Sequence, residues 1–206
     1  MKNVPQLRFA GFEGEWEEGT LGDLGSVSMN RRIYKEETSE IGDVPFYKIG
    51  TFGGQADSFI SRDLFEEYKS KYPYPKIGDL LISASGSIGK VIEYKGEDAY
   101  YQDSNIVWLD INGKIKNSFL KQYYSTVNWN ELEGSTIKRL YNKDLLRKQI
   151  FYPILNEQEK IGDLFRKVDA LIEIQEGKVS KMEDFKKSML QKIFPKKGEL
   201  VPEFRF

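Results

Sequence analysis

The sequence predicts an α+β protein, with a globular mixed-sheet domain followed by a long C-terminal α-helix of coiled-coil type. Two observations support this fold class. Short strand-like runs alternate with glycine-rich and polar turns and two helical stretches through the first three quarters of the chain. From residue 156 to residue 194, apolar residues recur at steps of three and four, which is the period of an amphipathic helix.

The first seventy residues contain an irregular arm, two strands and a helix. Residues 1–20 space apolar side chains among glycines and glutamates, so we expect a docked arm without regular structure. A short strand and a long polar loop are expected after Thr20. The alternation over 44–52 predicts a second strand, and the helical spacing over 63–72 predicts a helix.

Residues 75–94 predict two strands, LLIS and KVIEY, joined by the turn ASGSIG. Gly86, Gly89 and Lys90 invite comparison with a phosphate-binding loop, but the first required glycine and the Ser/Thr are missing, so that motif fails. The glycines suit a tight connection where a side chain would clash. Alternatively, a group of polar side chains lines a groove that touches a polyanion: Ser83, Ser85, Ser87 and Lys90.

Residues 99–111 predict one strand whose polar start, Gln102–Asn105, either reads base edges or caps a turn. A helix over 117–127, capped by Asn117 or Ser118, is expected next. The stretch that follows predicts a short strand, a helical turn capped by Asn142, and a strand ending at Pro153.

The long helix is predicted to begin at Asn156 as N-cap, answered by Glu159, and to end before Pro195. It would be on the order of 55 Å long, more than a small domain can cover. The residues expected to form a dimer through this helix are Ile161, Leu164, Val168, Leu171, Gln175, Met182, Phe185 and Met189. Gln175 and Lys178 interrupt the apolar seam near its middle, where a partner helix would cross. A helix packed only on its own domain is the alternative.

Composition limits the function classes. The 206 residues are 39% hydrophobic, with no cysteine and no signal-peptide or membrane-spanning pattern, so we expect a cytoplasmic protein that does not enter a membrane. The absence of histidine and cysteine removes the commonest general base, zinc ligands and thiol nucleophile. This composition argues against most hydrolytic mechanisms, and we expect no metal site. An enzyme using Asp79 with Asp103 is a minor alternative, because nothing in the sequence brings these carboxylates together.

The net charge of −1 gives no global argument for nucleic-acid binding, so any DNA site must be local. Acidic residues crowd the first part of the chain. Basic residues gather later, and this basic cluster is the better candidate surface: Lys138, Arg139, Lys143, Arg147 and Lys148.

Several segments, in this order, resemble the DNA-specificity (S) subunits of type I restriction-modification systems. They are VPQLRFAGF, EEGTLGDL, PKIGDLLISASGSIGKV, YQDSNIVWL, STIKRLYNKDLLRKQIFYP, EQEKIGDLFRKVDALIEIQ and KKSMLQKIFP. The resemblance implies a target-recognition domain over 1–155, a conserved-region helix over 156–194 for dimerisation and partner binding, and a tail over 195–206. GELVPEFRF in that tail echoes VPQLRFAGF at 4–12, so the chain resembles a half-subunit with one domain and one helix of each kind.

The resemblance further implies a non-catalytic, DNA-reading subunit. Two copies would associate antiparallel through their helices and recognise an interrupted palindrome in double-stranded DNA. The chain itself would carry no cofactor. S-adenosylmethionine would bind the methyltransferase (M) subunits, and ATP the restriction (R) subunit.

The candidate DNA-binding residues combine amides, arginines, lysines and hydroxyls in predicted loops. They are Arg31, Arg32, Lys48, Ser85, Ser87, Lys90, Gln102, Ser104, Asn105, Lys138, Arg139, Tyr141, Asn142 and Lys143. The competing interpretation is a coiled-coil adaptor whose globular head binds protein instead of DNA.

Overall fold

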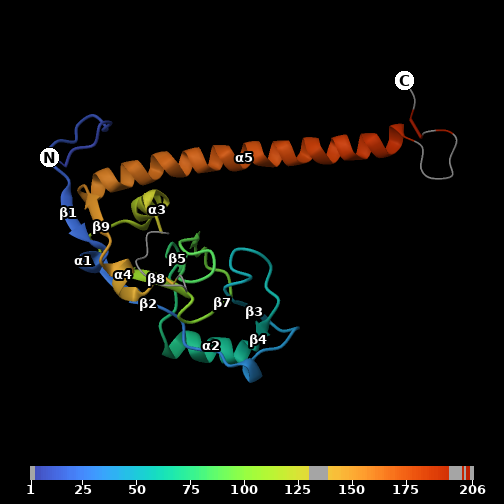
Figure 1. The fold of residues 1–206 in the computed structure, drawn as a ribbon, viewed down its shortest axis with the longest axis horizontal. Helices are drawn as coiled ribbons and strands as arrows, with labels where there is room; N and C mark the ends of the chain where they lie inside the picture. Colours follow the sequence, from blue (N-terminus) through green and yellow to red (C-terminus); the bar gives the residue numbers. More distant parts are fainter. Residues whose placement is uncertain (1–2, 130–138, 195–200, 202, 205–206) are drawn as a thin grey trace. The chain divides into compact units, whose positions relative to one another are not determined.

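The computed structural model describes residues 3–129, 139–194, 201 and 203–204. The chain forms two compact units, the first reaching Gly162 and the second beginning at Asp163 (Figure 1). The helices are α1 (Leu21–Leu24), α2 (Arg62–Lys71), α3 (Asn117–Thr126), α4 (Asn142–Leu146), α5 (Leu155–Ile193) and the 3-10 turn η1 (Lys35–Glu37). The strands are β1 (Glu17–Thr20), β2 (Gly25–Ser28), β3 (Val44–Tyr47), β4 (Phe59–Ile60), β5 (Leu80–Ser83), β6 (Val91–Glu93), β7 (Tyr100–Tyr101), β8 (Ile106–Ile111) and β9 (Gln149–Tyr152).

The central sheet of the first unit is antiparallel, with strand order β2-β8-β5-β6. Successive side chains of a strand point to opposite faces, and here both faces are buried. Ile82 and Val107 belong to one core cluster, whereas Leu81, Ile106 and Trp108 belong to the other. The sheet is therefore covered on both sides, which explains why β5 is buried at all four positions.

Helices α1, α3 and α4 contribute to the first of these clusters, through Leu21, Phe119 and Leu145 among others. A second sheet, of order β4-β3-β7, pairs β3 antiparallel with β4 and parallel with β7. Its apolar side chains pack with Phe65 of α2 in a third cluster. The α+β prediction with mixed sheets and a long final helix is confirmed.

Polar contacts fix the start of α5. The carbonyl of Ile154 accepts from the backbone N–H groups of Glu157 and Gln158, at 3.0 and 3.1 Å, so the helix begins before Asn156. The predicted N-cap at Asn156 is wrong, because that residue already lies in the first turn. The Gln158 side chain is fully buried; its amide nitrogen donates to the Pro153 carbonyl at 2.8 Å, and its oxygen accepts from the backbone N–H of Lys116 at 2.8 Å.

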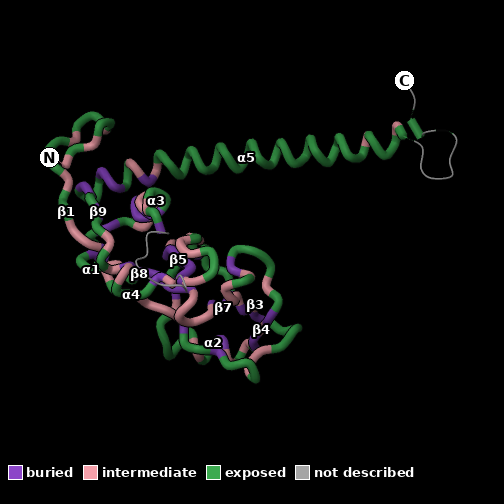
Figure 2. The backbone as a smooth tube through the Cα atoms, viewed as in Figure 1, coloured by how far each residue is buried: buried purple, intermediate pink, exposed green. Residues whose placement is uncertain are grey.

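Close approach to α3 continues through the second turn of α5. Gly162 is buried against Ser118, and a Cβ added at Gly162 would lie 2.6 Å from the Ser118 Cβ. Ile161 is partly buried against the first core cluster. The helix up to Gly162 is therefore packed as part of the globular unit (Figure 2).

Three predicted elements differ from the structure in extent. The arm over 1–20 contains β1, which pairs with β9, and the one-turn helix α1 follows it directly. The strand expected over 44–52 ends at Tyr47, because a turn begins at Lys48. The single strand expected over 99–111 is two strands, β7 and β8, separated by the turn Gln102–Asn105.

Two predicted helix caps are also wrong. Helix α3 has Lys116 in the N-cap position with no side-chain cap; the Asn117 amide donates instead to the Asp79 carboxylate at 3.2 Å. Helix α4 has Tyr141 in the N-cap position, and Asn142 is its first residue. The short strand predicted before α4 falls mainly on positions outside the described residues.

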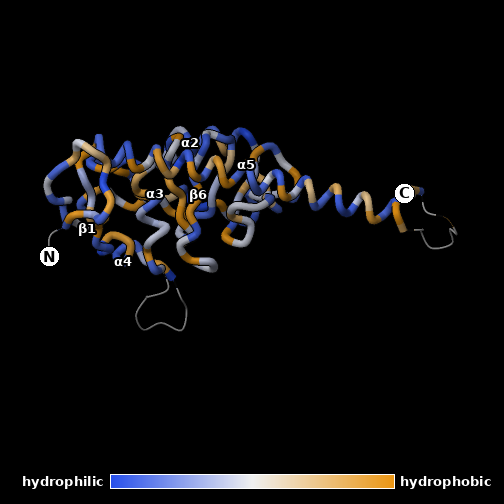
Figure 3. Tube along the Cα trace, turned by 90° about the horizontal axis from the view of Figure 1, so that it is seen from above, coloured by the Kyte–Doolittle hydropathy of each residue, from blue (hydrophilic) through white to orange (hydrophobic). Residues whose placement is uncertain are grey.

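In the second unit, α5 continues as one regular helix to Ile193. Its colouring alternates between hydrophobic and hydrophilic along the turns (Figure 3), as the sequence period requires. Among the helices of the described residues, none combines the length and the apolar character needed to span a membrane.

Candidate nucleic-acid interface

The turn Gln102–Asn105 between β7 and β8 is the centre of the candidate site in the first unit. Ser104 has φ 61°, and it is the only non-glycine residue of the described ranges in the left-handed region. A backbone conformation of this kind costs energy and persists only when surrounding contacts hold it, and such residues cluster at functional sites. Those contacts come from side chains that are far away in the sequence.

Two arginines bind this turn. The Arg32 guanidinium donates from Nε to Oδ2 of Asp103 at 3.0 Å, and Nη2 lies 2.9 Å from the same oxygen in an ion pair. This hydrogen bond, together with the carboxylate charge, raises the pKa of Arg32 above its ordinary value, so the side chain stays cationic. Nη2 of Arg139 donates to the Ser104 carbonyl at 2.7 Å. Two guanidinium groups therefore converge on one dipeptide.

The β5–β6 loop joins the same cluster. The Ser85 hydroxyl donates to the Asn105 side-chain oxygen at 2.8 Å, and the backbone N–H of Ala84 donates to the Asn105 carbonyl at 2.7 Å. Leu140 N–H donates to the Ala84 carbonyl at 2.8 Å, which positions Arg139 beside the loop. Five predicted residues thus lie in one hydrogen-bonded network, called the turn cluster here: Arg32, Ser85, Ser104, Asn105 and Arg139.

The glycines of this loop have a structural role. Gly89 has φ +82°, and a Cβ there would overlap the indole ring of the buried Trp129. The interpretation of a tight connection that excludes a side chain therefore accounts for Gly89. Ser83 does not line a groove: it is buried, and its hydroxyl donates to the Ser87 carbonyl within the loop.

Three other predicted residues have partners elsewhere in the domain. The Gln102 side-chain oxygen accepts from the backbone N–H of Ile49 at 2.9 Å, so it joins two loops. The Lys90 ammonium donates to the Phe52 carbonyl at 2.6 Å. Lys48 forms an exposed ion pair with Asp57 at 2.8 Å.

The remaining candidates within the described residues lie on the surface. Tyr141, Asn142 and Lys143 are exposed at the start of α4, and the Lys143 ammonium lies 5.9 Å from the centre of the Tyr141 ring. The Arg31 guanidinium lies 5.3 Å from the centre of the Tyr72 ring. Lys138 lies outside the described residues.

Asp103 is a site residue that sequence reasoning assigned to another role. The minor enzymatic alternative paired it with Asp79, but the two carboxylates serve different local structures. Asp79 accepts from the backbone N–H of Lys76 at 2.8 Å and from Asn117, whereas Asp103 binds Arg32. Nothing in the sequence around Asp103 indicates that it binds Arg32, because the two residues are 71 positions apart.

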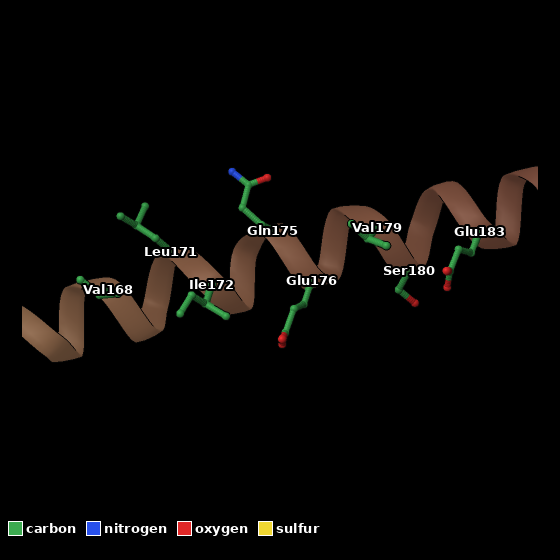
Figure 4. A pocket seen from close by; sticks show the side chains of 8 residues that line it. All are labelled: Val168, Leu171, Ile172, Gln175, Glu176, Val179, Ser180 and Glu183. Atoms are coloured by element: carbon green, nitrogen blue, oxygen red, sulfur yellow. The ribbon is translucent and has the colours of Figure 1, made fainter. Parts of the chain in front are cut away.

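The second unit presents an apolar face along α5. Five of the predicted dimer residues have between 40% and 71% of their surface exposed: Leu164, Val168, Leu171, Met182 and Phe185. Gln175 is also exposed, and Met189 is partly exposed. A shallow concave face runs along the helix past Val168, Leu171, Ile172, Gln175, Glu176, Val179, Ser180 and Glu183 (Figure 4). Within its own unit, no described segment covers this face.

Three comparisons relate the chain to known proteins. A putative type I restriction enzyme specificity subunit from Haemophilus influenzae is 50% identical over 152 residues, which cover 73% of this chain and 40% of that protein. A chain solved in a study of complex assembly and conformational transition of the type I restriction-modification system matches with a TM-score of 0.61 at 19% identity, covering 89% of this chain and 47% of that one. The HsdS subunit of Thermoanaerobacter tengcongensis matches with a TM-score of 0.57 at 17% identity, covering 84% and 41%.

The chain spans less than half the length of each of these three relatives. At such identities the two solved structures support the fold alone. Residues 13–184 match the family described as the type I restriction modification DNA specificity domain. Because this match covers most of the sequence, the chain belongs to the family of type I restriction-modification DNA specificity domains.

Proposed function

We propose that this chain is the non-catalytic DNA-recognition subunit of a type I restriction-modification complex, and that its first unit reads one short half-site in the major groove. Family membership supports the proposal. The turn cluster supplies guanidinium, amide and hydroxyl groups, which are the groups that bind base edges. The exposed Lys143 at the start of α4 suits a phosphate contact, which positions a protein without reading sequence.

Two copies of the chain associate antiparallel through α5 in this proposal. The observation that supports this association is the apolar face from Leu164 to Phe185, which is exposed within its own unit. Contiguous exposed apolar surface marks an interaction site. A two-fold axis near Gln175 would pair the Leu171 region of one copy with the Val179 region of the other. Two identical half-sites separated by a spacer then form an interrupted palindrome.

The proposed partners are double-stranded DNA, M subunits and an R subunit. In this proposal S-adenosylmethionine binds the M subunits, ATP binds the R subunit, and this chain binds no cofactor of its own. Membership in the family of type I restriction-modification DNA specificity domains supports these partners.

Retention of duplex DNA by the full chain, with and without its M subunit, tests DNA recognition. We expect sequence-specific retention with the M subunit present, and affinity that falls steeply as salt rises, because phosphate contacts release counterions. Binding that does not depend on salt under any partner condition would contradict the proposal. Capture of a protein ligand by the isolated head, without DNA binding, would instead establish the adaptor function.

The methylation pattern of DNA from cells that express this chain with its M subunit tests the symmetry. The expected target consists of two inverted copies of one half-site at a fixed spacing. A target with two different half-sites would exclude recognition by a homodimer.

A further inference from the structure

The Arg32–Asp103 pair differs from an ordinary surface ion pair in how its two side chains are placed. Only 14% of the Asp103 side chain is exposed, against 59% of the Arg32 side chain. The Ser104 hydroxyl also donates to Oδ2 of Asp103, at 3.2 Å. The carboxylate is therefore set into the turn cluster, while the guanidinium that it holds faces solvent.

The hydrogen bonds leave one edge of Arg32 free. Nε donates to Oδ2 of Asp103, and Nη2 lies within ion-pair distance of that same oxygen. Within the described part of the chain, Nη1 has no hydrogen-bond partner, and Nη2 keeps a second N–H. The Nη1/Nη2 edge of a guanidinium matches the O6 and N7 acceptors of guanine in the major groove.

The carboxylate also argues against a phosphate contact. Asp103 compensates the positive charge of Arg32 and would repel a DNA phosphate close to the pair. A fixed carboxylate therefore weakens non-specific attraction, but it restricts the guanidinium to one orientation, as direct base recognition requires. Arg139, which is bound to the adjacent Ser104 carbonyl, adds a second fixed guanidinium to the same turn.

We propose that Arg32 reads a guanine of the half-site and that Asp103 is the positioning residue that orients it. The inference rests on the proposed DNA-recognition function and adds to it a chemical constraint: the half-site contains a G·C pair facing Arg32.

The test uses the full chain with its M subunit and a pool of duplexes with a randomised central stretch, sequenced after capture. The wild-type chain is expected to select a site with an invariant G·C pair. Asp103→Asn is expected to lose roughly tenfold or more of the preference at that pair, while affinity for unselected duplex stays equal or rises. Arg32→Lys, which keeps the charge but not the two-pronged edge, is expected to lose the same preference.

Asp98→Asn is the matched control. Asp98 forms an ion pair with Arg62 of α2 at 2.5 Å, but both side chains are about half exposed. Its removal should leave every position of the selected site unchanged. If Asp103→Asn and Asp98→Asn have equal thermal unfolding midpoints, both variants are folded and the comparison of their selected sites is valid.

The possible failures are distinguishable. A selected site whose G·C preference survives in Asp103→Asn and Arg32→Lys overturns the inference and leaves the proposed function standing. A selected site without any G·C pair does the same. A wild-type chain that selects no sequence from the pool overturns the proposed function together with the inference.

Discussion

The Arg8 guanidinium binds the Glu157 carboxylate through two hydrogen bonds, Nε to Oε1 at 2.8 Å and Nη2 to Oε2 at 2.7 Å. Glu157 is 1% exposed and lies in the first turn of α5, whereas Arg8 belongs to the N-terminal arm. The pairing raises the pKa of Arg8 above its ordinary value. The arm is therefore attached to the start of the helix by a buried, bidentate ion pair.

Replacement of Arg8 is expected to destabilise the first unit, because Arg8→Ala leaves a buried carboxylate without its cation. The unfolding midpoint should fall by roughly 5–10 °C in a thermal melt. Arg166→Ala is the control, since Arg166 pairs with Asp163 at 2.8 Å on the exposed surface of the same helix. It should change the midpoint by no more than about a degree.

A double variant separates charge from packing in this pair. Arg8→Met combined with Glu157→Met removes both charges and retains apolar volume, so it should recover most of the lost stability. A double variant as unstable as Arg8→Ala would show that the loss arises from packing of the arm and not from an unpaired charge.

Substitution of Gly89 tests the structural role of the β5–β6 loop. Gly89→Ala is expected to lower the free energy of unfolding by about 3 kcal/mol, because it combines a strained φ with overlap of the Trp129 ring. Gly113→Ala is matched in backbone, with φ +87°, but its Cβ would meet nothing within 4 Å. Gly113→Ala should lower the free energy of unfolding by about 1 kcal/mol, as measured by denaturant titration. Equal losses in both variants would mean that Trp129 moves aside freely.

A charge within the apolar face of α5 is expected to abolish dimers. Leu171→Asp should convert the chain to a monomer in light scattering, since it would place a carboxylate in the helix interface. Ala170→Asp adds the same charge outside the apolar stripe and should leave the mass unchanged. A parent chain that is monomeric at all accessible concentrations would remove the homodimer from the proposed function.

Asp23 should contribute to stability in a pH-dependent manner. Its carboxylate accepts from the hydroxyl and the backbone N–H of Thr20, at 2.7 and 2.8 Å, and these bonds hold the pKa of Asp23 below its ordinary value. Its stabilising effect is therefore present at neutral pH and is lost as pH falls through the lowered pKa.

Thermal melts of Asp23→Asn between pH 7 and pH 3 measure this contribution. The variant should be less stable than wild type at pH 7, and the gap should close on acidification. Thr20→Val removes one of the two donors and should give an intermediate gap. An unchanging gap across the range would contradict the assignment.

Long, periodic elements of the fold were predictable from the sequence. The stripe of α5 and the spacing of α2 identify helices because their apolar positions repeat over several turns. Helix α1 was not predictable, since four residues contain barely one period. The β1–β9 pair was not predictable either, because its partners, such as Glu17 and Tyr152, are brought together only by the complete fold.

For the candidate site, residue type and loop position predicted which side chains to consider, but not how they meet. Arg32, Ser85 and Arg139 come from three separate segments, and their common partner is one short turn. The left-handed conformation of Ser104 has no sequence signature, because serine seldom adopts it. Asp103 matters through a contact that only the folded chain creates.

The absence of a side chain at Gly162 has a consequence for the construction of chimeras. The helix is packed against α3 up to this glycine. A recognition domain should therefore be joined to a foreign helix after Gly162 and not at Leu155, where the helix begins. A graft cut at Leu155 would exchange Glu157 and Gln158 for whatever the recipient carries. A graft cut after Gly162 would keep the head with its own first two helical turns, and specificity could then be transplanted as one piece.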